Sequence, residues 1–512
     1  MTDPTTSIEV ERKLTVPQTF SLDDVAGPLS EIGAVQRERT RTLVAVYYDT
    51  DDYRLARAHI TLRRRTGGND SGWHLKLPAD GLNGDGRREV SVPLRAGAPG
   101  KVPSSLANEV VAITGGSPLM PLATQKTKRM PVTLLDGGRP GLEIVDDSVT
   151  VTEGSQSGTA YRELEVEVMS SPALLGPAVR VLTEAGAEPA TSASKGVRAL
   201  VGDSLLAPLV DPGSRPKPKD PAADAVAYHL RTQVAAIIEQ DQRVRHDLPD
   251  AVHQYRVAAR RLRSVLQAFG PLVDERWASQ MRVELGWIAS TLSQSRDREV
   301  LEARLVDAVR ALPVDLDGAA TLATIQKHLD AELHEAKATI EEAMVSGRYR
   351  ELMAALHLAA ASPPTTELAT GKASVVLPPL VKRSWKRLDK QARGLHDELE
   401  GHDDHWHRAR IAAKKARYTV EACVPVFGNP AKKFARQLET VTELLGEHQD
   451  AAIAAALVQE LSTKTRGARA TFAMGVLFAG QREQVDDCRR EFIRTWPEVS
   501  RHRWRTWLAA TT

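Results

Sequence analysis

The sequence predicts a multidomain α+β protein in which an N-terminal antiparallel β-barrel is followed by an all-α helical bundle with an internal duplication. Three observations lead to this prediction. The first part of the chain contains short strand patterns with charged residues at alternate positions. A proline-rich segment then precedes a part rich in Ala, Leu, Arg, Glu and Gln, with few strand patterns. A basic helical motif occurs twice in that second part.

Length and composition set the limits of the interpretation. The chain has 512 residues, enough for two or more domains that each bury a core. A formal net charge of +2 means that any anion binding must come from local clusters of charge. The two cysteines, Cys423 and Cys488, exclude a disulfide framework and suit a reducing compartment. The start lacks the pattern of a signal peptide and no apolar stretch is long enough to span a bilayer, so we expect a cytoplasmic protein.

The first strand pattern with charged residues at alternate positions covers residues 8–14. Apolar and polar residues alternate there, which places Glu9, Glu11 and Lys13 on one face. The pattern over residues 161–168 carries three carboxylates on one face in the same way. These two strands predict that carboxylates gather on one side of a sheet.

Further strand patterns lie between these two. They cover residues 41–50, 60–65, 73–77, 87–92, 124–135 and 141–147. Arg87 is in phase with Glu89, and Glu143 is in phase with Asp147. Helices are expected near residues 106–113 and 173–185. Seven or eight short strands with few helices indicate one antiparallel barrel.

Inward-facing carboxylates and cations suit a metal ion bound to a polyanion. Mg²⁺ and Mn²⁺ prefer carboxylate oxygens, and Mg²⁺ is usually held by a few carboxylates together with substrate phosphates. Arg and Lys neutralise the remaining phosphate charge. The alternative is a barrel whose charges face water and pair across neighbouring strands. Five in-phase charged strands favour the inward arrangement. Buried carboxylates are costly unless such cations neutralise them.

These motifs resemble the CYTH superfamily, the triphosphate tunnel metalloenzymes. Residues 9–13 match its ExExK pattern, and the other motifs follow in the family's order over about residues 5–205. The resemblance implies an eight-stranded tunnel that binds a triphosphate-containing ligand with Mg²⁺ or Mn²⁺. The implied catalytic residues are Glu9, Glu11, Lys13, Glu165 and Glu167. The implied metal-associated carboxylates are Glu9, Glu11, Glu89, Glu143, Asp147, Glu165 and Glu167. The implied phosphate-binding cations are Lys13, Arg63, Arg65, Lys76, Arg87, Lys126, Lys128, Arg129 and Lys195. Which of Lys126, Lys128 and Arg129 faces the tunnel is left open by the residues.

The composition changes after the tunnel motifs. Residues 206–221 contain five prolines and a glycine and are predicted to form an extended linker. This divides the chain into a tunnel domain at 1–205, the linker, and a helical domain at 222–512.

The helical domain contains a duplicated basic motif. Residues 251–263 return as residues 405–417, and residues 292–297 are echoed by residues 445–450. The paired positions are His253 with His407, Arg256 with Arg410, Arg260 with Lys414, and Arg263 with Arg417. This spacing places each set on one helical face, although like charges four residues apart cost about 0.2–0.5 kcal/mol per pair. Two such faces brought together would form a positive groove. The alternative is a solvated basic face balanced by acidic residues of neighbouring helices.

A polyphosphate suits this groove better than a nucleic acid. The domain has no nucleic-acid-binding motif, no basic tail and few aromatic residues interleaved with its basic runs. The repeated HxxRxxx(R/K)xxR pattern resembles the CHAD domain over about residues 220–510. That resemblance implies polyphosphate binding and association with polyphosphate granules. Lysines at 414 and 415 replace two arginines of the first copy, which keeps the charge but loses the bidentate fork.

The leading hypothesis is therefore a triphosphatase that hydrolyses inorganic triphosphate and is joined to a polyphosphate-binding module. One alternative is another substrate, such as thiamine triphosphate or a nucleotide, including cyclase chemistry on ATP. The other alternative is a polyphosphate adaptor whose tunnel binds without catalysis. We expect neither a membrane nor a nucleic acid as partner.

Overall fold

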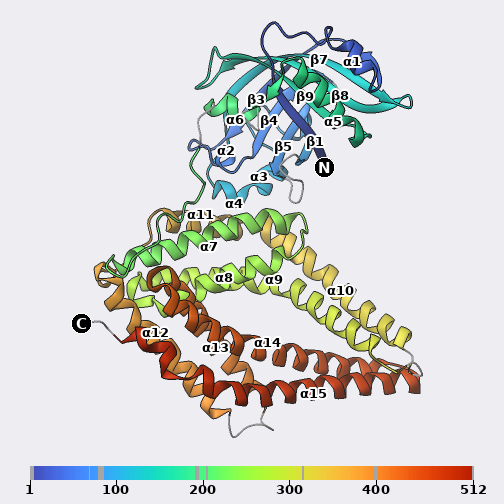
Figure 1. Cartoon of the computed structure of the whole chain (residues 1–512). Coiled ribbons are helices and arrows are strands. Elements are labelled where there is room, and N and C mark those ends of the chain that lie inside the picture. Colours follow the sequence, from blue (N-terminus) through green and yellow to red (C-terminus); the bar gives the residue numbers. More distant parts are fainter. Residues whose placement is uncertain are drawn as a thin grey trace. The chain divides into compact units, whose positions relative to one another are not determined.

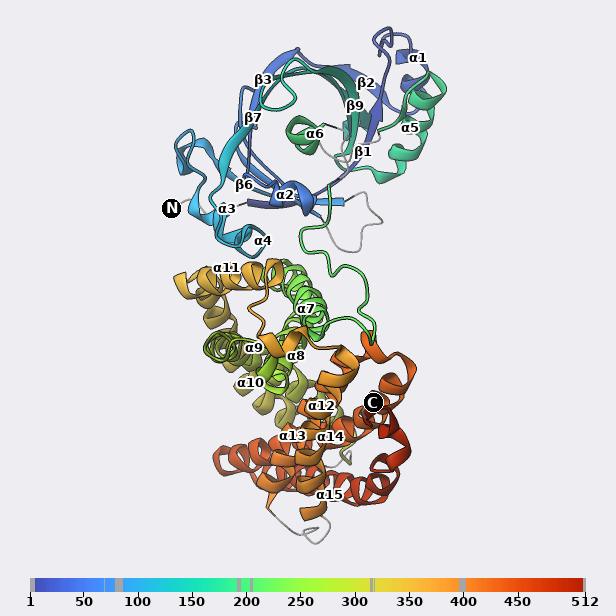
Figure 2. The same ribbon diagram turned by 90° about the vertical axis from the view of Figure 1, so that its left-hand side faces the viewer.

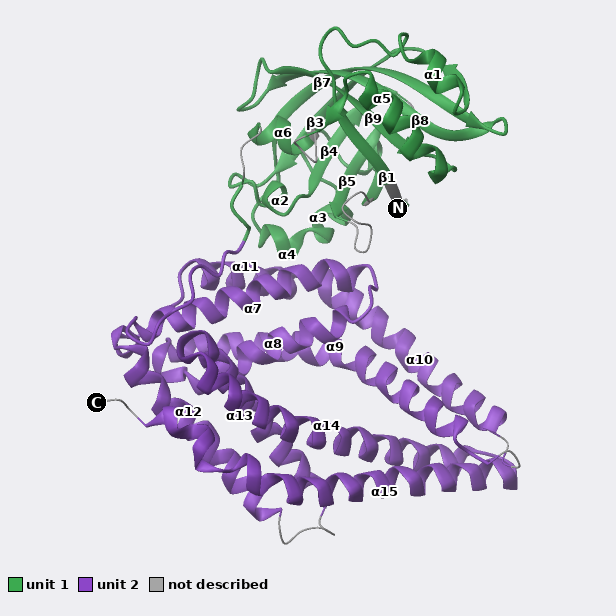
Figure 3. Ribbon diagram, viewed as in Figure 1, with its two compact units in different colours: residues 1–209 green, residues 210–512 purple. Residues whose placement is uncertain are grey.

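The computed structural model describes residues 5–68, 70–78, 86–190, 195–202, 206–313, 316, 318–395 and 402–509, without the side chains of Ile8, Glu9 and Lys195. The chain divides into two compact units (Figure 3). Unit 1 is Met1–Leu209 and unit 2 is Val210–Thr512. This division falls within the proline-rich segment 206–221.

Unit 1 is built on a closed ring of eight antiparallel strands, which confirms the predicted antiparallel barrel (Figure 2). In ring order the strands are β1 (Thr5–Thr15), β6 (Gly86–Pro93), β5 (Gly72–Pro78), β4 (Thr61–Thr66), β3 (Arg41–Asp49), β7 (Met120–Asp136), β8 (Arg139–Glu153) and β9 (Ala160–Val168). Pairing of β9 with β1 closes the ring. Two short strands extend the sheet: β2 (Ala34–Arg37) pairs with β7, and β10 (Glu188–Pro189) pairs with β1.

One apolar cluster of this ring lies on its outer side, and a second packs Tyr47 against Ala199 and Leu200. Leu164 and Val166 of β9 are fully buried in a cluster with Leu142 and Ile144 of β8 and with Leu182 of the covering helix α5 (Leu175–Glu184). The alternate residues of the same strands are the charged ones. Because successive side chains of a strand point to opposite faces, burying the apolar face under helices directs the charged face into the ring.

The other helices of unit 1 are short. They are α1 (Ala26–Ser30), α2 (Arg54–Arg57), α3 (Ser104–Glu109), α4 (Val111–Thr114) and α6 (Lys195–Val201), with 3₁₀ turns at Leu94–Ala96 and Pro172–Leu174. The helix expected near 106–113 is thus two short helices that meet at Val110. Helix α6 lies within the ring of strands in Figure 2. A Cβ atom at Gly196 would come within 2.6 Å of the Tyr47 ring and 2.7 Å of the Thr61 methyl group, so glycine allows α6 to pack directly against the inner wall.

Unit 2 is helical, with long antiparallel hairpins (Figure 1). Its helices are α7 (Ala222–Arg245), α8 (Ala251–Ala268), α9 (Glu275–Arg310), α10 (Gly318–Val345), α11 (Gly347–Ala361), α12 (Ala373–Gly394), α13 (Asp403–Phe427), α14 (Asn429–Lys464) and α15 (Ala468–Val499). Shorter 3₁₀ turns lie at Gly270–Leu272, Glu367–Thr370 and His502–Leu508. None of the helices in the described part of the chain is long and apolar enough to cross a lipid bilayer.

The internal duplication is visible in the helices. The duplicated motif occupies α8 in the first copy and α13 in the second. Each is followed by a helix of 36 residues, α9 or α14. The second echoed segment, at 292–297 and 445–450, lies within these two long helices. The predicted repeat is therefore a repeated pair of helices.

The outward-facing core can be tested at Leu164, which has 0% of its surface exposed. We expect Leu164→Ala to destabilise unit 1 by about 2–5 kcal/mol, because it removes buried methyl groups and leaves a cavity. Met169→Ala, at a residue 54% exposed, is the control and should change the stability by less than about 0.5 kcal/mol. Calorimetry of the full chain measures both. Equal effects of the two substitutions would place the core elsewhere.

Candidate functional site

The ring of unit 1 encloses a charged cavity of about 210 Å³. Fourteen described residues line it, and eleven of them are charged. The cations are Lys13, Arg63, Arg65, Lys76 and Arg129; the carboxylates are Glu11, Asp70, Glu89, Glu143, Glu165 and Glu167; Tyr47, Thr61 and Gly196 complete the lining. Ten of the residues predicted from the sequence are therefore brought together in one cavity.

Carboxylates are concentrated on three adjacent strands. Glu11 of β1 lies directly opposite Glu167 of β9, which lies directly opposite Glu143 of β8. Like charges at opposite positions of neighbouring strands destabilise a sheet. Glu143 has no ion pair within 4.0 Å among the described residues, and its pKa is raised, first by burial and then by Glu38 and Asp147 against the effect of Arg129. This row of carboxylates would gain from a cation placed between them.

Two basic residues border this row. The Lys13 ammonium lies 3.3 Å from Glu11 and 3.2 Å from Glu165. Arg129 forms a bidentate pair with the buried Asp147, at 3.0 and 2.6 Å, and also lies 3.0 Å from Glu165. Glu165 is therefore neutralised by two cations, whereas Asp147 orients Arg129 from behind and is absent from the cavity lining.

Cations dominate the opposite arc. Arg63 and Arg65 project from β4, and burial together with the neighbouring Arg63 and Arg129 lowers the pKa of Arg65. Asp70 pairs with Arg65 from the adjacent turn. Arg65 stays protonated, so the lowered pKa means that its buried positive charge is energetically unfavourable. A bound anion would stabilise this charge.

Glu89 of β6 contacts both His74 and Lys76 on the cationic arc. One oxygen lies 2.6 Å from Nδ1 of His74, and the other lies 3.2 Å from the Lys76 ammonium. Burial alone would raise the pKa of Glu89, but the hydrogen bond from His74 and the charges of Lys76 and Arg63 lower it. This carboxylate is therefore engaged in positioning cations.

Some predicted tunnel residues lie elsewhere. Of the three basic candidates on β7, Arg129 lines the cavity, whereas Lys126 and Lys128 are exposed and belong to the opposite face of the strand. Their predicted place in the tunnel is therefore corrected. Arg87 is in phase with Glu89, but it does not line the cavity and its Nη1 donates to the carbonyl of His59 at 3.2 Å. The side chains of Glu9 and Lys195 lie outside the described residues.

Four cavity residues were not predicted from the sequence. Tyr47, Thr61 and Gly196 lie in or beside the tunnel motifs, but they are uncharged and carry no pattern that indicates metal or phosphate binding. Asp70 lies in a turn, where strand periodicity does not apply.

The carboxylates fit a divalent metal bound together with phosphate. In the described part of the chain, no three His, Cys, Asp or Glu side chains form a metal-binding group by themselves. Mg²⁺ does not need such a cage, because it usually takes one or two carboxylates and fills its other positions with water and phosphate oxygens. Glu11 and Glu167, which lie directly opposite each other, would be the residues that hold it.

Unit 2 contains a second basic site, where the two copies of the motif face each other. Arg260 and Arg263 of α8 and Arg410 and Lys414 of α13 line a cavity of about 350 Å³. Its other lining residues are Ser264, Gln267, Arg282, Ile411 and Lys415. We call this cavity the motif groove. Six of its nine lining residues are cations and none is acidic. Arg282, from α9, belongs to neither copy of the motif and was missed.

Lys414 is partly buried beside other cations of the motif groove. Burial, followed by Arg410 and Arg260, lowers its pKa to about 7, although Asp450 opposes this effect. The two copies supply matching acidic partners from their long helices. Arg256 donates to Asp297 at 3.0 Å, and Asp450, the counterpart of Asp297, is the main charge opposing the lowered pKa of Arg410. Acidic neighbours thus balance part of the basic face, while the groove itself remains cationic.

The remaining motif residues differ between the copies. Arg263 lines the groove, but its counterpart Arg417 pairs with Glu421 at 2.6 Å and with Glu439, so the predicted place of Arg417 in the groove is corrected. Nδ1 of His407 lies 2.7 Å from Oε1 of Gln449. His253 and His407 do not line the groove, and burial together with Arg296 lowers the pKa of His253 despite the presence of Asp250.

Comparisons with known proteins agree with the division of the chain into unit 1 and unit 2. The family model for the CYTH domain matches residues 7–195, and that for the CHAD domain matches residues 228–459. Two uncharacterized proteins of Mycobacterium tuberculosis, from strains CDC 1551 / Oshkosh and H37Rv, are each 31% identical over 519 residues, covering 95% of this chain and 95% of their own.

Several solved structures are similar to parts of the chain. PptA from Streptomyces chartreusis is 26% identical, with 54% of this chain and 100% of that chain covered and a TM-score of 0.47. The CHAD domain of Ricinus communis is 24% identical, with 56% and 95% covered and a TM-score of 0.45. A Hippeastrum protein with a dominant triphosphatase activity is 17% identical, with 39% and 98% covered and a TM-score of 0.25.

The charged ring, the duplicated basic helices, the two matched domain models and the relatives that span almost the whole chain lead to one conclusion: this protein belongs to the family in which a CYTH domain of the triphosphate tunnel enzymes is followed by a CHAD domain.

Proposed function

We propose that unit 1 hydrolyses inorganic triphosphate with Mg²⁺ or Mn²⁺ and that unit 2 binds inorganic polyphosphate. The observation that carries the first part is the lining of the tunnel, where eleven of the fourteen described residues are charged. Tyr47 is the one aromatic residue among them, so the described lining offers no pair of apolar faces for a nucleobase or a thiazole ring. This favours an inorganic substrate over a nucleotide or thiamine triphosphate.

The arrangement of charges suits a phosphate chain laid across the cavity. Arg63, Arg65 and Lys76 would bind the phosphate oxygens on the basic arc, Arg as a fork and Lys as a point charge. The bound Mg²⁺ or Mn²⁺ would neutralise phosphate charge and polarise the bond that breaks. Positioning and charge stabilisation account for most of the catalysis in phosphoryl transfer.

Glu143 is the residue that we assign to the attacking water. Its carboxylate lacks a described ion pair and its raised pKa makes it a better proton acceptor than the neutralised Glu165. Lys13 and Arg129 pair with Glu165 at 3.2 and 3.0 Å. A tunnel that only binds, as in a polyphosphate adaptor, would not need a carboxylate of this kind.

Polyphosphate binding by unit 2 rests on the motif groove. Six cations line one cavity without a carboxylate, and burial together with mutual repulsion lowers the pKa of Lys414. A bound polyanion would relieve this repulsion. None of the described residues that line the groove is aromatic, so a base has no ring there on which to stack, which disfavours nucleic acid as the ligand.

Glu11→Gln tests the acidic row. The change is nearly isosteric and removes one carboxylate charge, so we expect tripolyphosphate hydrolysis to fall at least about 10²-fold at limiting Mg²⁺ while the melting temperature is retained. Phosphate release measures the rate across tripolyphosphate, ATP and thiamine triphosphate. Glu188→Gln, at an exposed position of β10, is the control and should act as the wild type. Normal turnover by Glu11→Gln would remove this carboxylate from the site.

Lys414→Arg tests the groove through its pH dependence. With a pKa of about 7, Lys414 loses its proton as the pH rises above neutrality, so polyphosphate binding must then take up a proton. We expect the affinity of the full chain for long polyphosphate to fall by up to about tenfold per pH unit above 7. Arg stays charged, so Lys414→Arg should flatten this profile. The affinity is measured by titration calorimetry at constant ionic strength. Identical profiles for both proteins would contradict the assignment.

A further inference from the structure

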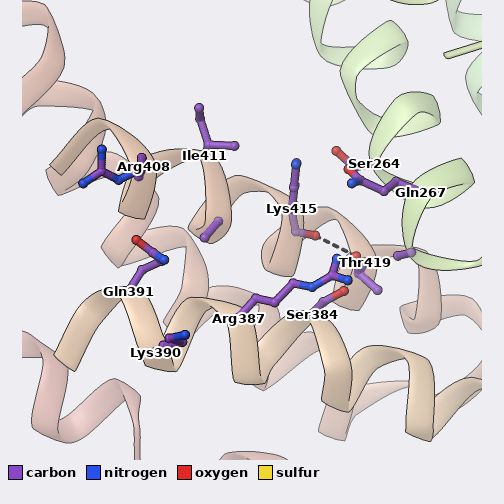
Figure 4. Close-up of a pocket in the computed structure, with 12 residues that line it drawn as sticks. Ser264, Gln267, Ser384, Arg387, Lys390, Gln391, Arg408, Ile411, Lys415 and Thr419 are labelled. Carbon is purple, nitrogen blue, oxygen red and sulfur yellow. Dashed lines mark hydrogen bonds between the residues drawn. The ribbon is translucent and has the colours of Figure 1, made fainter. Parts of the chain in front are cut away.

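A second basic pocket adjoins the motif groove but lies outside the duplicated pattern. It has a volume of about 290 Å³ and lies between α12, α13 and the end of α8 (Figure 4). Helix α12 contributes Ser384, Arg387, Lys390 and Gln391, and α13 contributes Arg408, Ile411, Ala412, Lys415 and Thr419; Ser264, Gln267 and Ala268 complete it. We call this cavity the α12 pocket. Its described lining has four cations and no carboxylate.

The α12 pocket and the motif groove are continuous. Four residues, Ser264, Gln267, Ile411 and Lys415, line both cavities. Lys415 lies at the junction. Burial lowers its pKa most, followed by Arg282, Arg387 and Arg263. The charge of this lysine is therefore repelled by cations of both cavities.

The charge of the joined surface exceeds what a short ligand can balance. Together the two cavities present nine cations, and no Asp or Glu lines either of them in the described chain. Arg387, Lys390 and Arg408 have no carboxylate within 4.0 Å among the described residues, although other arginines of α12 and α13, such as Arg393 and Arg417, do. A tripolyphosphate carries roughly four to five charges near neutral pH, counting about two on each terminal phosphate.

We propose that the α12 pocket is a second subsite for the same polyanion, so that unit 2 selects long polyphosphate chains over tripolyphosphate. This proposal rests on polyphosphate binding by the motif groove. A chain bound there would continue past Lys415 and place further phosphates against Arg387, Lys390 and Arg408. The amide and hydroxyl groups of Gln267, Gln391 and Ser384 would donate hydrogen bonds to its oxygens.

The double variant Arg387→Ala/Lys390→Ala of the full chain tests the subsite. Its matched control is Lys382→Ala/Arg383→Ala, which removes the same charges from exposed positions of α12 outside the pocket. Affinities for long-chain polyphosphate and for tripolyphosphate are measured by titration in EDTA, which suppresses hydrolysis in the tunnel, and binding to unit 2 is taken as the part that Arg260→Ala/Arg410→Ala removes. Melting temperatures, and tripolyphosphate hydrolysis after Mg²⁺ is added, show that both units remain folded.

We expect the pocket variant to bind long polyphosphate at least about tenfold more weakly, with its salt slope reduced by about one to two, because two phosphate contacts and their released counterions are lost. Its affinity for tripolyphosphate should change less than about twofold. If the pocket variant binds long chains no more weakly than the control does, or loses both ligands equally, the subsite is wrong.

A third variant separates this failure from a failure of the proposed function. Arg260→Ala/Arg410→Ala removes cations from the motif groove itself. Weak binding by this variant alone would keep polyphosphate as the ligand of unit 2 and exclude the α12 pocket from its path. Wild-type affinity of this variant would overturn polyphosphate binding by the groove, and the subsite with it.

Discussion

A closed ring of strands has only two faces, and in β8 and β9 of unit 1 the face covered by helices points outward. Helices α1 and α5 pack on that outer face over Leu142, Leu164 and Val166. The inner face must then hold whatever alternates with these residues, which in β1, β8 and β9 means carboxylates. A ring that buries this many charges is stable only if they compensate each other, so cations fill the opposite arc. The position of the core therefore determines the chemistry of the tunnel.

In unit 2, packed helices bring like charges together, as the strands do in unit 1. Packing of α8 against α13 brings two basic faces together, and the acidic counterparts lie behind them on α9 and α14. Asp297 accepts a hydrogen bond from Arg256, and the charge of Asp450 opposes the lowered pKa of Arg410; neither aspartate lines the cavity. Burial, with repulsion from Arg410 and Arg260, lowers the pKa of Lys414. In both units, charges that destabilise the protein alone become favourable when a polyanion is present.

The fold and much of the tunnel could be predicted because period-two alternation assigns each residue of a regular strand to a face. The rule does not decide where both faces of a strand carry the same kind of residue. Strand β7 has basic residues at 126 and 128 on one face and at 129 on the other, so the sequence could not show that Arg129 points inward. In unit 2 the repeat located both basic helices, but it could not show that Glu421 and Glu439 pair with Arg417. Arg282 entered the groove from a helix outside the motif, and this required the tertiary packing.

Gly196 links the evolution of α6 to that of the ring. A single methyl group at this position would come within 3 Å of Tyr47 and Thr61, two residues of the cavity wall. The three positions therefore cannot drift independently. A relative with a side chain at position 196 should carry smaller residues at 47 or 61, or hold α6 farther out and have a deeper tunnel. Variation at this one position would thus indicate tunnel depth across the family.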